Sequence, residues 1–248
     1  MSDFYLLAPH SPDSRESLKD LPMFVLDKVS FFRPGFGSQK RLDRRGRITI
    51  IDNISLTVSQ GERIGILGHN GAGKTTLLRL LAGIFRPHEG TATVHPDTAA
   101  ILDAGFGIEP WLSGRENAVS RLVLSGTPKS ERELLVSDLE QFLELGPYFD
   151  EPTRTYSTGM LARLVFGLGT VRQHAAIVVD EGFGTVDEQF QKRAWSRLEG
   201  VIGGDTTVVM ASHNLDQIRA HCTRGVLLQR GRVLLDADIE KVIRTYLG

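Results

Sequence analysis

Residues 64–76 read Ile-Gly-Ile-Leu-Gly-His-Asn-Gly-Ala-Gly-Lys-Thr-Thr, and this stretch decides the fold. It opens with an apolar run typical of a buried strand, contains Gly-x4-Gly-Lys-Thr from Gly68 to Thr75, and continues into the leucine-rich run Leu77–Leu81. This is the pattern of a phosphate-binding P-loop between a strand and a helix. Glycines let backbone N–H groups close around phosphate oxygens, and the N-terminus of the helix adds a positive dipole end. The sequence therefore predicts an α/β protein that binds a nucleoside triphosphate.

Two side chains of this loop have distinct predicted tasks. Lys74 should reach the β- and γ-phosphates, and the hydroxyl of Thr75 should bind Mg²⁺. The residues of the loop that we expect to contact the nucleotide are Gly68, Asn70, Gly71, Gly73, Lys74, Thr75 and Thr76.

The composition is that of an ordinary globular protein. The 248 residues are 41% hydrophobic and 24% charged, and they carry a net charge of −1. A chain whose main partner is nucleic acid is expected to carry a clear excess of basic residues, and this chain does not. Cys222 is the single cysteine, which excludes an internal disulfide and agrees with a reducing compartment. Residues 1–20 do not resemble a secretory signal, and no run approaches about 18 consecutive apolar residues, so we do not expect the chain to cross a membrane by itself.

The pattern along the chain predicts one domain over residues 22–248 after a flexible tail over residues 1–21. Strand-like segments near Met23–Val29 and at Ile48–Val58 indicate an antiparallel β-lobe beside the P-loop core. The basic loop between them, up to Arg47, is a candidate for contact with anionic lipid head groups, although a solvated loop is the more ordinary interpretation. Residues about 109–160 form a predicted helical subdomain. The second half is expected to alternate strands (Ala175–Val179, Thr206–Ala211) with helices (Ser157–Arg172, Gln189–Val201, Leu215–His221) before a terminal hairpin over residues 226–235.

An acidic pair follows an apolar strand about a hundred residues after the P-loop. Asp180 is suited to hold Mg²⁺ through water, and Glu181 is suited to act as the general base that polarises an attacking water. Acids often merely begin loops, but this pair gains weight from the P-loop that precedes it.

The segment Tyr156-Ser157-Thr158-Gly159-Met160 opens a helix and resembles the signature segment of the ABC ATPase family. A capping serine, a glycine and free N–H groups make an anion site at the helix start; taken alone, the segment would suit a simple helix cap. The resemblance implies that Ser157 and Gly159 bind ATP, that His213 is the switch histidine at the γ-phosphate, and that Asp187 belongs to a D-loop coupling two subunits.

The resemblance covers about Met23–Asp236 and is tightest to exporters of bacterial surface polysaccharides: capsule, O-antigen and teichoic acid. Three segments carry this narrower assignment, namely residues 113–117 (Ser-Gly-Arg-Glu-Asn), 154–160 (Arg-Thr-Tyr-Ser-Thr-Gly-Met) and 190–193 (Phe-Gln-Lys-Arg). The sequence departs from the family pattern in two places: Asp103 is the nearest polar residue to the position where most members have a glutamine, and Thr158 replaces a small residue of the signature. The candidate for stacking on adenine is Phe31 or Phe32.

The family resemblance implies a P-loop core of ABC-ATPase type with an antiparallel β-lobe and a helical subdomain. It also implies a homodimer that closes two ATP molecules between the P-loop of one copy and the signature of the other, with Mg²⁺ as cofactor. Opening of the dimer would drive a separate polytopic permease through the groove near Trp111–Asn117, which places the protein at the cytoplasmic face of the inner or cytoplasmic membrane. No nucleic acid is expected.

Three other functions compete with this interpretation. A soluble ABC-type ATPase that acts on ribosomes or DNA usually carries two cassettes or long inserted coiled coils. An ABC exporter of another substrate would share all the ATPase features. A P-loop kinase or GTPase switch would leave the signature serine and the switch histidine without a task.

Overall fold

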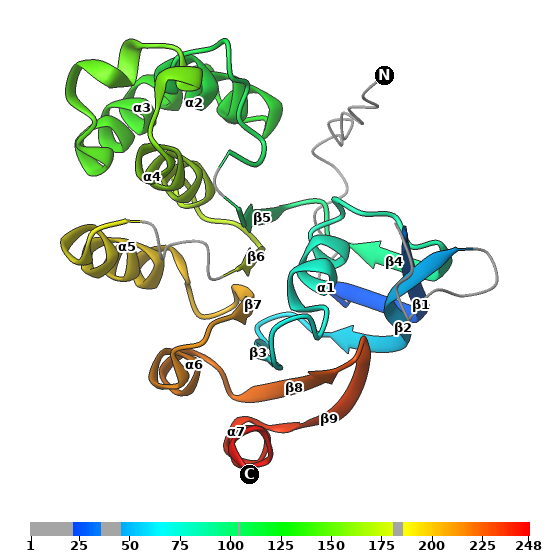
Figure 1. Ribbon diagram of the computed structural model, residues 1–248. Coiled ribbons are helices and arrows are strands. Elements are labelled where there is room, and N and C mark those ends of the chain that lie inside the picture. The colour runs from blue at the N-terminus through cyan, green and yellow to red at the C-terminus, as the bar shows by residue number, and fades with distance from the viewer. Residues whose placement is uncertain (1–21, 36–45, 104, 181–185) are drawn as a thin grey trace. The chain divides into compact units, whose positions relative to one another are not determined.

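The computed structural model describes residues 22–35, 46–103, 105–180 and 186–248 (Figure 1). The chain divides into two compact units, which we name the P-loop unit and the helical unit. The P-loop unit contains residues 22–35, 46–101, 174–180 and 202–248 of the described chain, and the helical unit contains residues 102–103, 105–173 and 186–201. The predicted N-terminal tail, most of the basic loop, Glu181, Gly184 and Thr185 lie outside the described residues.

The P-loop unit is built on a six-stranded sheet in the order β5-β6-β7-β3-β8-β9. Its strands are β3 (Arg63–Leu67), β5 (Thr98–Ile101), β6 (Ala176–Val179), β7 (Thr207–Ala211), β8 (Arg224–Gln229) and β9 (Arg232–Asp238). The first five strands in the sheet order are parallel, and β9 pairs antiparallel with β8 as the predicted hairpin. Every residue of β6 and β7 is buried, which is why both read as unbroken apolar runs. The helices of this unit are α1 (Lys74–Leu81), α6 (Leu215–His221) and α7 (Ile239–Leu247).

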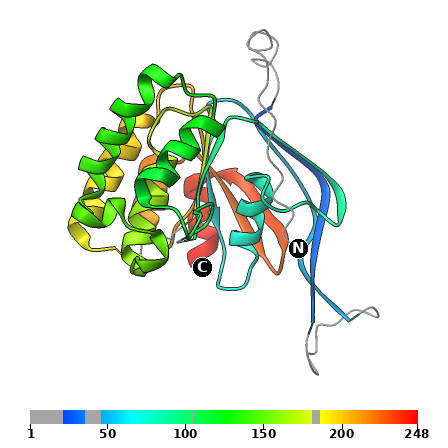
Figure 2. The same cartoon turned by 90° about the horizontal axis from the view of Figure 1, so that it is seen from above.

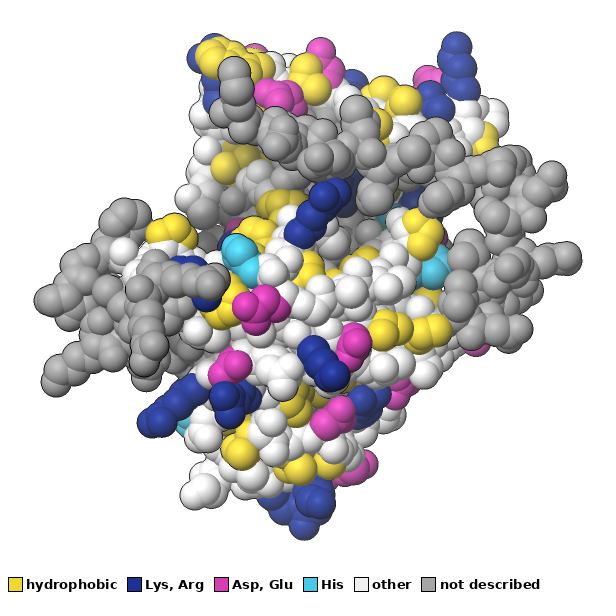
Figure 3. Space-filling model, turned by 90° about the vertical axis from the view of Figure 1, so that its right-hand side faces the viewer, with side chains coloured by type: hydrophobic (Ala, Val, Ile, Leu, Met, Phe, Trp, Pro, Cys, Tyr) yellow, Lys and Arg dark blue, Asp and Glu magenta, His cyan; other side chains and the backbone are white. Residues whose placement is uncertain are grey.

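The predicted antiparallel lobe is a three-stranded sheet in the order β2-β1-β4. Its strands are β1 (Phe24–Pro34), β2 (Arg47–Val58) and β4 (Glu89–Val94), and Figure 2 shows β1 and β2 running side by side as long blue strands. Buried and exposed residues alternate along the second half of β2, as expected when one face of an antiparallel sheet packs on a core. On the side where Figure 1 shows this lobe, basic and acidic side chains are interspersed and hydrophobic atoms form small separate groups (Figure 3).

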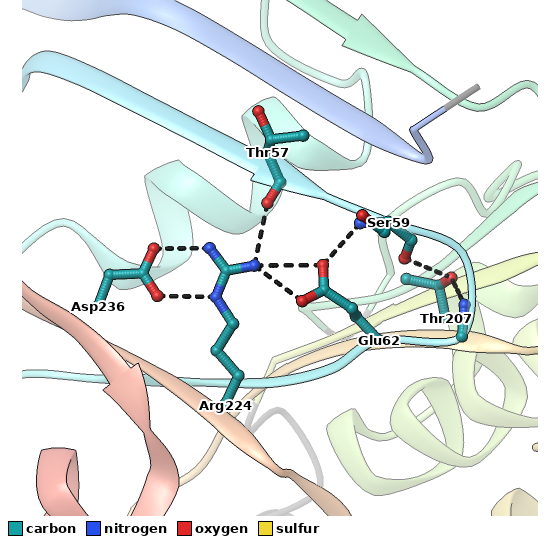
Figure 4. A network of polar contacts seen from close by, with 7 residues as sticks. Thr57, Ser59, Glu62, Thr207, Arg224 and Asp236 are labelled. Atoms are coloured by element: carbon teal, nitrogen blue, oxygen red, sulfur yellow. Dashed lines mark hydrogen bonds and ion pairs between the residues drawn. The ribbon is translucent and has the colours of Figure 1, made fainter. Parts of the chain in front are cut away.

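A polar network joins several strands of the P-loop unit (Figure 4). Arg224 of β8 makes two hydrogen bonds of 2.6 and 2.7 Å to Asp236 of β9 and two of 2.9 and 3.2 Å to Glu62. The same guanidinium donates to the carbonyl of Thr57 in β2 at 3.1 Å, and Glu62 accepts from the backbone N–H of Ser59. The planar guanidinium suits such multiple bonding, so one side chain ties the end of β2 to the central sheet.

The helical unit is a bundle of helices that share an apolar cluster. Its helices are α2 (Gly114–Leu124), α3 (Lys129–Leu143), α4 (Thr158–Gly169) and α5 (Glu188–Val201), with short 3-10 turns at Gly146–Asp150 and Thr153–Thr155. Both ribbon views place α2, α3 and α4 beside one another (Figures 1 and 2). Leu122, Leu139, Leu164 and Phe149 are almost fully buried at the centre of the cluster.

The helix expected over residues 157–172 is shorter at both ends. Ser157 caps it from outside, and the helix ends at Gly169, where Thr170 is the C-terminal cap and donates its N–H to the carbonyls of Phe166 and Gly167. The predicted limits of the helical subdomain, about 109–160, stay a prediction. None of the helices in the described part of the chain is long and apolar enough to span a membrane.

Candidate functional site

The P-loop lies between β3 and α1, as the sequence predicts. Gly73 is the cap position of α1 and has no side chain to offer to the N–H groups of the first turn, and a helix N-terminus of this kind suits an anion. Lys74, Thr75 and Thr76 form that first turn. The ammonium nitrogen of Lys74 lies 2.6 Å from the carbonyl oxygen of Gly68 and thus points back across the loop.

Two glycines of the loop are required by the backbone that surrounds it. Gly68 and Gly73 have φ angles of 151° and 108°, which side-chain-bearing residues rarely adopt. A Cβ on Gly68 would lie 2.5 Å from the carbonyl oxygen of Leu228, and one on Gly73 would lie 3.0 Å from that of Ile50. The loop is therefore held tightly against β8 and β2, with its polypeptide backbone as the lining.

The hairpin between β8 and β9 supports the same loop. Gly231 donates its N–H to the carbonyl of Ala72 in the P-loop at 2.9 Å and accepts from the N–H of Asp52 at 2.9 Å. On the other side, the ring of His69 lies 5.2 Å from the ring of Tyr246 in α7, measured between centroids. The terminal hairpin and helix thus contact the P-loop directly.

The strand order brings Asp180 and His213 to the edge of the sheet that carries the P-loop. The strands β6, β7 and β3 are adjacent and parallel, so their carboxyl ends meet at one edge, where ligands of open α/β sheets bind. The P-loop follows β3, Asp180 follows β6, and His213 follows β7 by two residues. Asp180 is 8% exposed and its N–H donates to the carbonyl of Ile101 at 2.9 Å. A buried carboxylate beside a P-loop is suited to a divalent cation.

The two candidates for adenine stacking already have aromatic or cationic neighbours within the P-loop unit. Phe31 is stacked on Phe85, with 4.9 Å between centroids and 5° between planes, and its edge meets His88. The guanidinium carbon of Arg47 lies 4.1 Å from the ring centroid of Phe32. Each ring therefore has one face covered, and adenine stacking stays a prediction for whichever face is open.

Asp103 follows β5 by two residues and belongs to the helical unit. It is exposed, and its carbonyl oxygen accepts from the N–H of Phe106 at 3.1 Å. Its proposed role in place of the family's glutamine stays a prediction.

The signature residues lie in the helical unit, where Ser157 is the cap of α4. Its hydroxyl oxygen accepts from the N–H of Met160 at 3.3 Å, so the capping function is present whatever else the serine does. A hollow of about 300 Å³ lies beside it, lined in part by Ser157, Gly159, Arg163 and Asp187. The predicted signature and D-loop residues therefore border one cavity.

Asp187 immediately precedes α5, and each of its two carboxylate oxygens accepts a hydrogen bond. One oxygen accepts from the N–H of Phe190 at 2.9 Å, and the other pairs with Arg163. The Phe190 N–H and the Arg163 guanidinium together lower the pKa of the Asp187 carboxyl. The sequence analysis did not single out Arg163; its position six residues after Ser157 on the signature helix is the signal that was available.

The five residues 113–117 form the cap and the first turn of α2. Ser113 and Glu116 form a reciprocal capping box at the start of α2, and Arg115 pairs with Asp150 at 2.6 Å and Glu140 at 2.8 Å. Asn117 is 5% exposed, and its amide donates to the carbonyls of Glu109, Leu112 and Ser113. The polar side chains of this segment therefore stabilise the start of α2 and its contacts within the helical unit.

Trp111 lies two residues before the cap of α2 and faces solvent. It is 69% exposed, and the guanidinium carbon of Arg154 lies 4.4 Å from its ring centroid. The N–H groups of Thr153 and Arg154 donate to the carbonyls of Leu112 and Pro110 at 2.9 and 3.0 Å. These bonds hold the segment before α2 against residues 153–154, and Trp111 lies between the two carbonyls that accept them. The predicted docking groove over Trp111–Asn117 stays a prediction, in which Trp111 is accessible and Asn117 is buried.

Comparison with known proteins identifies the class. The family described as ABC transporter matches residues 51–184, which is more than half of the chain. The chain therefore belongs to the ABC transporter family, and the predicted class, an ABC-type ATPase with a P-loop core and an antiparallel β-lobe, is confirmed.

Relatives of this chain include two O-antigen export system ATP-binding proteins. RfbE of Yersinia enterocolitica is 38% identical over 186 residues, covering 75% of this chain and 78% of the relative. RfbB of Klebsiella pneumoniae is 34% identical over 196 residues, covering 79% and 80%. The teichoic acids export ATP-binding protein TagH of Shouchella clausii is 32% identical over 196 residues, and the match spans only 54% of its length.

A solved structure with the same fold is a dimeric ATP-binding cassette in a post-hydrolysis state bound to ADP and Pi. It aligns with a TM-score of 0.71 at 19% sequence identity and covers 88% of this chain and 99% of its own. At this identity the likeness concerns the fold.

Proposed function

We propose that this chain is the ATP-hydrolysing subunit of a transporter that exports a surface polysaccharide, or a polysaccharide linked to lipid, through a separate transmembrane partner. The observation that carries the proposal is the sheet edge of the P-loop unit, where the loop, Asp180 and His213 follow three adjacent parallel strands. The polysaccharide cargo is supported by the identity of 38% and 34% to O-antigen export proteins over three quarters of the chain.

Each predicted site residue around the P-loop has a part in the proposed reaction. The N–H groups of the loop and the Lys74 ammonium bind the phosphates, and His213 contacts the γ-phosphate. Glu181 holds the attacking water as general base, and its neighbour Asp180 faces the metal. Because phosphoryl transfer depends on positioning and charge stabilisation, loss of Lys74 or Glu181 should reduce turnover by about 10³-fold.

The donors in the P-loop unit fit Mg²⁺. The hydroxyl of Thr75 and the buried carboxylate of Asp180 are oxygen donors, and Mg²⁺ is commonly bound by one or two such side chains together with substrate phosphates. The ion supplies charge neutralisation at the β- and γ-phosphates when it is bound.

The working unit in this proposal is a homodimer. Each ATP is held by the P-loop of one copy and closed by Ser157 and Gly159 of the other, whose helix start is an anion site. The hollow that Ser157, Gly159 and Asp187 line in the helical unit is the surface offered to that second copy. Opening of the dimer drives the permease through the loop that presents Trp111, at the cytoplasmic face of the membrane.

Size-exclusion chromatography of Glu181→Gln tests the sandwich. Since this variant should bind ATP without hydrolysing it, we expect a dimer with Mg-ATP and a monomer without nucleotide. Ser157→Arg in the same background is the control, because it fills the anion site of the signature while leaving the P-loop untouched. A variant that binds ATP yet stays monomeric in the presence of a permease would contradict the proposed dimer.

Affinity capture from detergent-solubilised membranes tests the partner. We expect a polytopic membrane protein to be recovered with the tagged wild-type chain, and less of it with Trp111→Ala. Recovery of ribosomes or nucleic acid instead would favour the alternative of a soluble ABC-type ATPase and would overturn the export function.

A further inference from the structure

An arginine on the helix that the signature serine caps is paired with the D-loop aspartate. Arg163 lies on α4, six residues after Ser157, and its side chain is 22% exposed. Its guanidinium pairs with Asp187 at the start of α5 and donates to the carbonyl of Leu143 at the end of α3, at 3.2 Å. One side chain therefore joins three helices of the helical unit.

An aromatic ring holds this guanidinium in place. Phe190 of α5 is fully buried, and the guanidinium carbon of Arg163 lies 4.8 Å from its ring centroid. The ring also contacts Phe142 and Phe166, with centroids 5.2 and 6.3 Å away. A cation over an aromatic face is attracted by the ring quadrupole, so Phe190 fixes Arg163 in the direction of Asp187.

The carboxylate of Asp187 is equally constrained. It accepts from the N–H of Phe190 as well as from Arg163. The carboxylate is therefore bound both to the first turn of α5 and to a side chain of α4. Arg163 and Asp187 also line the hollow beside Ser157. The ion pair is thus part of the surface on which the proposed γ-phosphate contact is made.

We propose that Arg163 is a positioning residue of the ATPase: it locks Asp187 to the signature helix, so that the signature and the D-loop of one copy move as a single body. The inference rests on the proposed function. Ser157, Arg163 and Asp187 line the same hollow, so loss of the ion pair would loosen the spacing between the signature and the D-loop. The site that the proposed dimer closes would then be assembled less accurately.

A second arginine provides a matched control. Arg197 of α5 pairs with Asp138 of α3, and its guanidinium carbon lies 4.4 Å from the ring centroid of Phe142. It therefore makes the same two kinds of contact as Arg163, in the same unit, but with a carboxylate that has no assigned role in the reaction. Its removal reports on stability alone.

The test compares kcat, KM for ATP and the thermal midpoint of Arg163→Met, Arg163→Lys, Asp187→Asn and Arg197→Met in the full chain. We expect kcat to fall by about 10- to 100-fold in Arg163→Met, since small misplacements of catalytic groups have effects of this size. KM should stay within about twofold because the P-loop is intact. Arg163→Lys should recover part of kcat, and Arg197→Met should lower the thermal midpoint while keeping kcat.

A double-mutant cycle then separates positioning from packing. Asn at position 187 can still accept from the N–H of Phe190, so Asp187→Asn removes the charge and keeps the helix cap. If Arg163 acts through Asp187, the double variant should lose little more kcat than either single variant. Multiplicative losses, or a kcat in Arg163→Met equal to that of Arg197→Met, would overturn the inference.

The controls distinguish this failure from failure of the proposed function. A wild-type chain that neither hydrolyses ATP nor dimerises with it would overturn the function itself. A wild-type chain that is active, together with an active Arg163→Met, would overturn only the role of Arg163. Should Arg163→Met fail to fold, Asp187→Asn and Arg163→Lys still decide the question.

Discussion

Replacing Gly114 by alanine should destabilise the helical unit through close contacts with two aromatic side chains. A Cβ at this position would lie 2.6 Å from the hydroxyl oxygen of Tyr156 and 2.9 Å from the nearest ring carbon of Phe149, which is fully buried. Overpacking of this kind typically costs about 1 to 3 kcal/mol, and the higher helix propensity of alanine returns at most about 1 kcal/mol. We therefore expect a net loss of about 1 to 2 kcal/mol in the free energy of unfolding.

The tyrosine allows the origin of that loss to be tested. Tyr156→Phe alone removes the hydrogen bond of 2.6 Å to the carbonyl of Tyr148, at a cost of about 1 to 2 kcal/mol. In Gly114→Ala/Tyr156→Phe the closest clash is absent, so the double variant should be more stable than the sum of the two losses by at least about 0.5 kcal/mol. Chemical denaturation followed by circular dichroism measures all three variants. Additive losses, or an unchanged stability of Gly114→Ala, would refute the reasoning.

Two further predictions concern the P-loop unit. Arg224→Met removes the bonds to Asp236 and Glu62. Because all three side chains are about one third exposed, we expect the free energy of unfolding to fall by only about 1 to 3 kcal/mol. The thermal midpoint should be lower in this variant and partly restored in Arg224→Lys, whereas an unchanged midpoint in both variants would contradict the prediction. Burial raises the pKa of the Cys222 thiol from its usual 9.0 to about 12, so folding favours the protonated form. That stabilisation is complete below pH 9 and is lost as the pH rises towards 12. The native thiol should accordingly resist alkylation at pH 9 until the protein is denatured, and rapid labelling of the folded chain would show that the thiol is accessible.

The sequence predicts what depends on short-range pattern. The P-loop, the buried strands β6 and β7, and the lobe were all expected, because each is specified by consecutive residues whose spacing matches a strand, a turn or a helix. The placement of Asp180 and His213 at the P-loop edge needed the strand order, which pairs segments more than a hundred residues apart and leaves no trace in periodicity. For that step the family resemblance was necessary.

Polar residues with structural tasks were harder to recognise. Asn117 and Arg115 read as part of an exposed docking segment, yet Asn117 is buried and ties three backbone carbonyls together. Likewise Arg163 looks like a solvated helix residue, because its partner Asp187 is 24 positions away. The long charged or amide side chains of such residues suit both water and a buried network, and only the packing decides between them.

The exposed ring of Trp111 gives the protein a reporter that sees one unit only. The chain has two tryptophans, and both, Trp111 and Trp195, belong to the helical unit. Selective excitation of indole fluorescence therefore observes that unit while the P-loop unit remains dark. A change of emission on addition of ATP to the wild-type chain would record the passage of the signal from the nucleotide to the bundle, without any label having to be introduced.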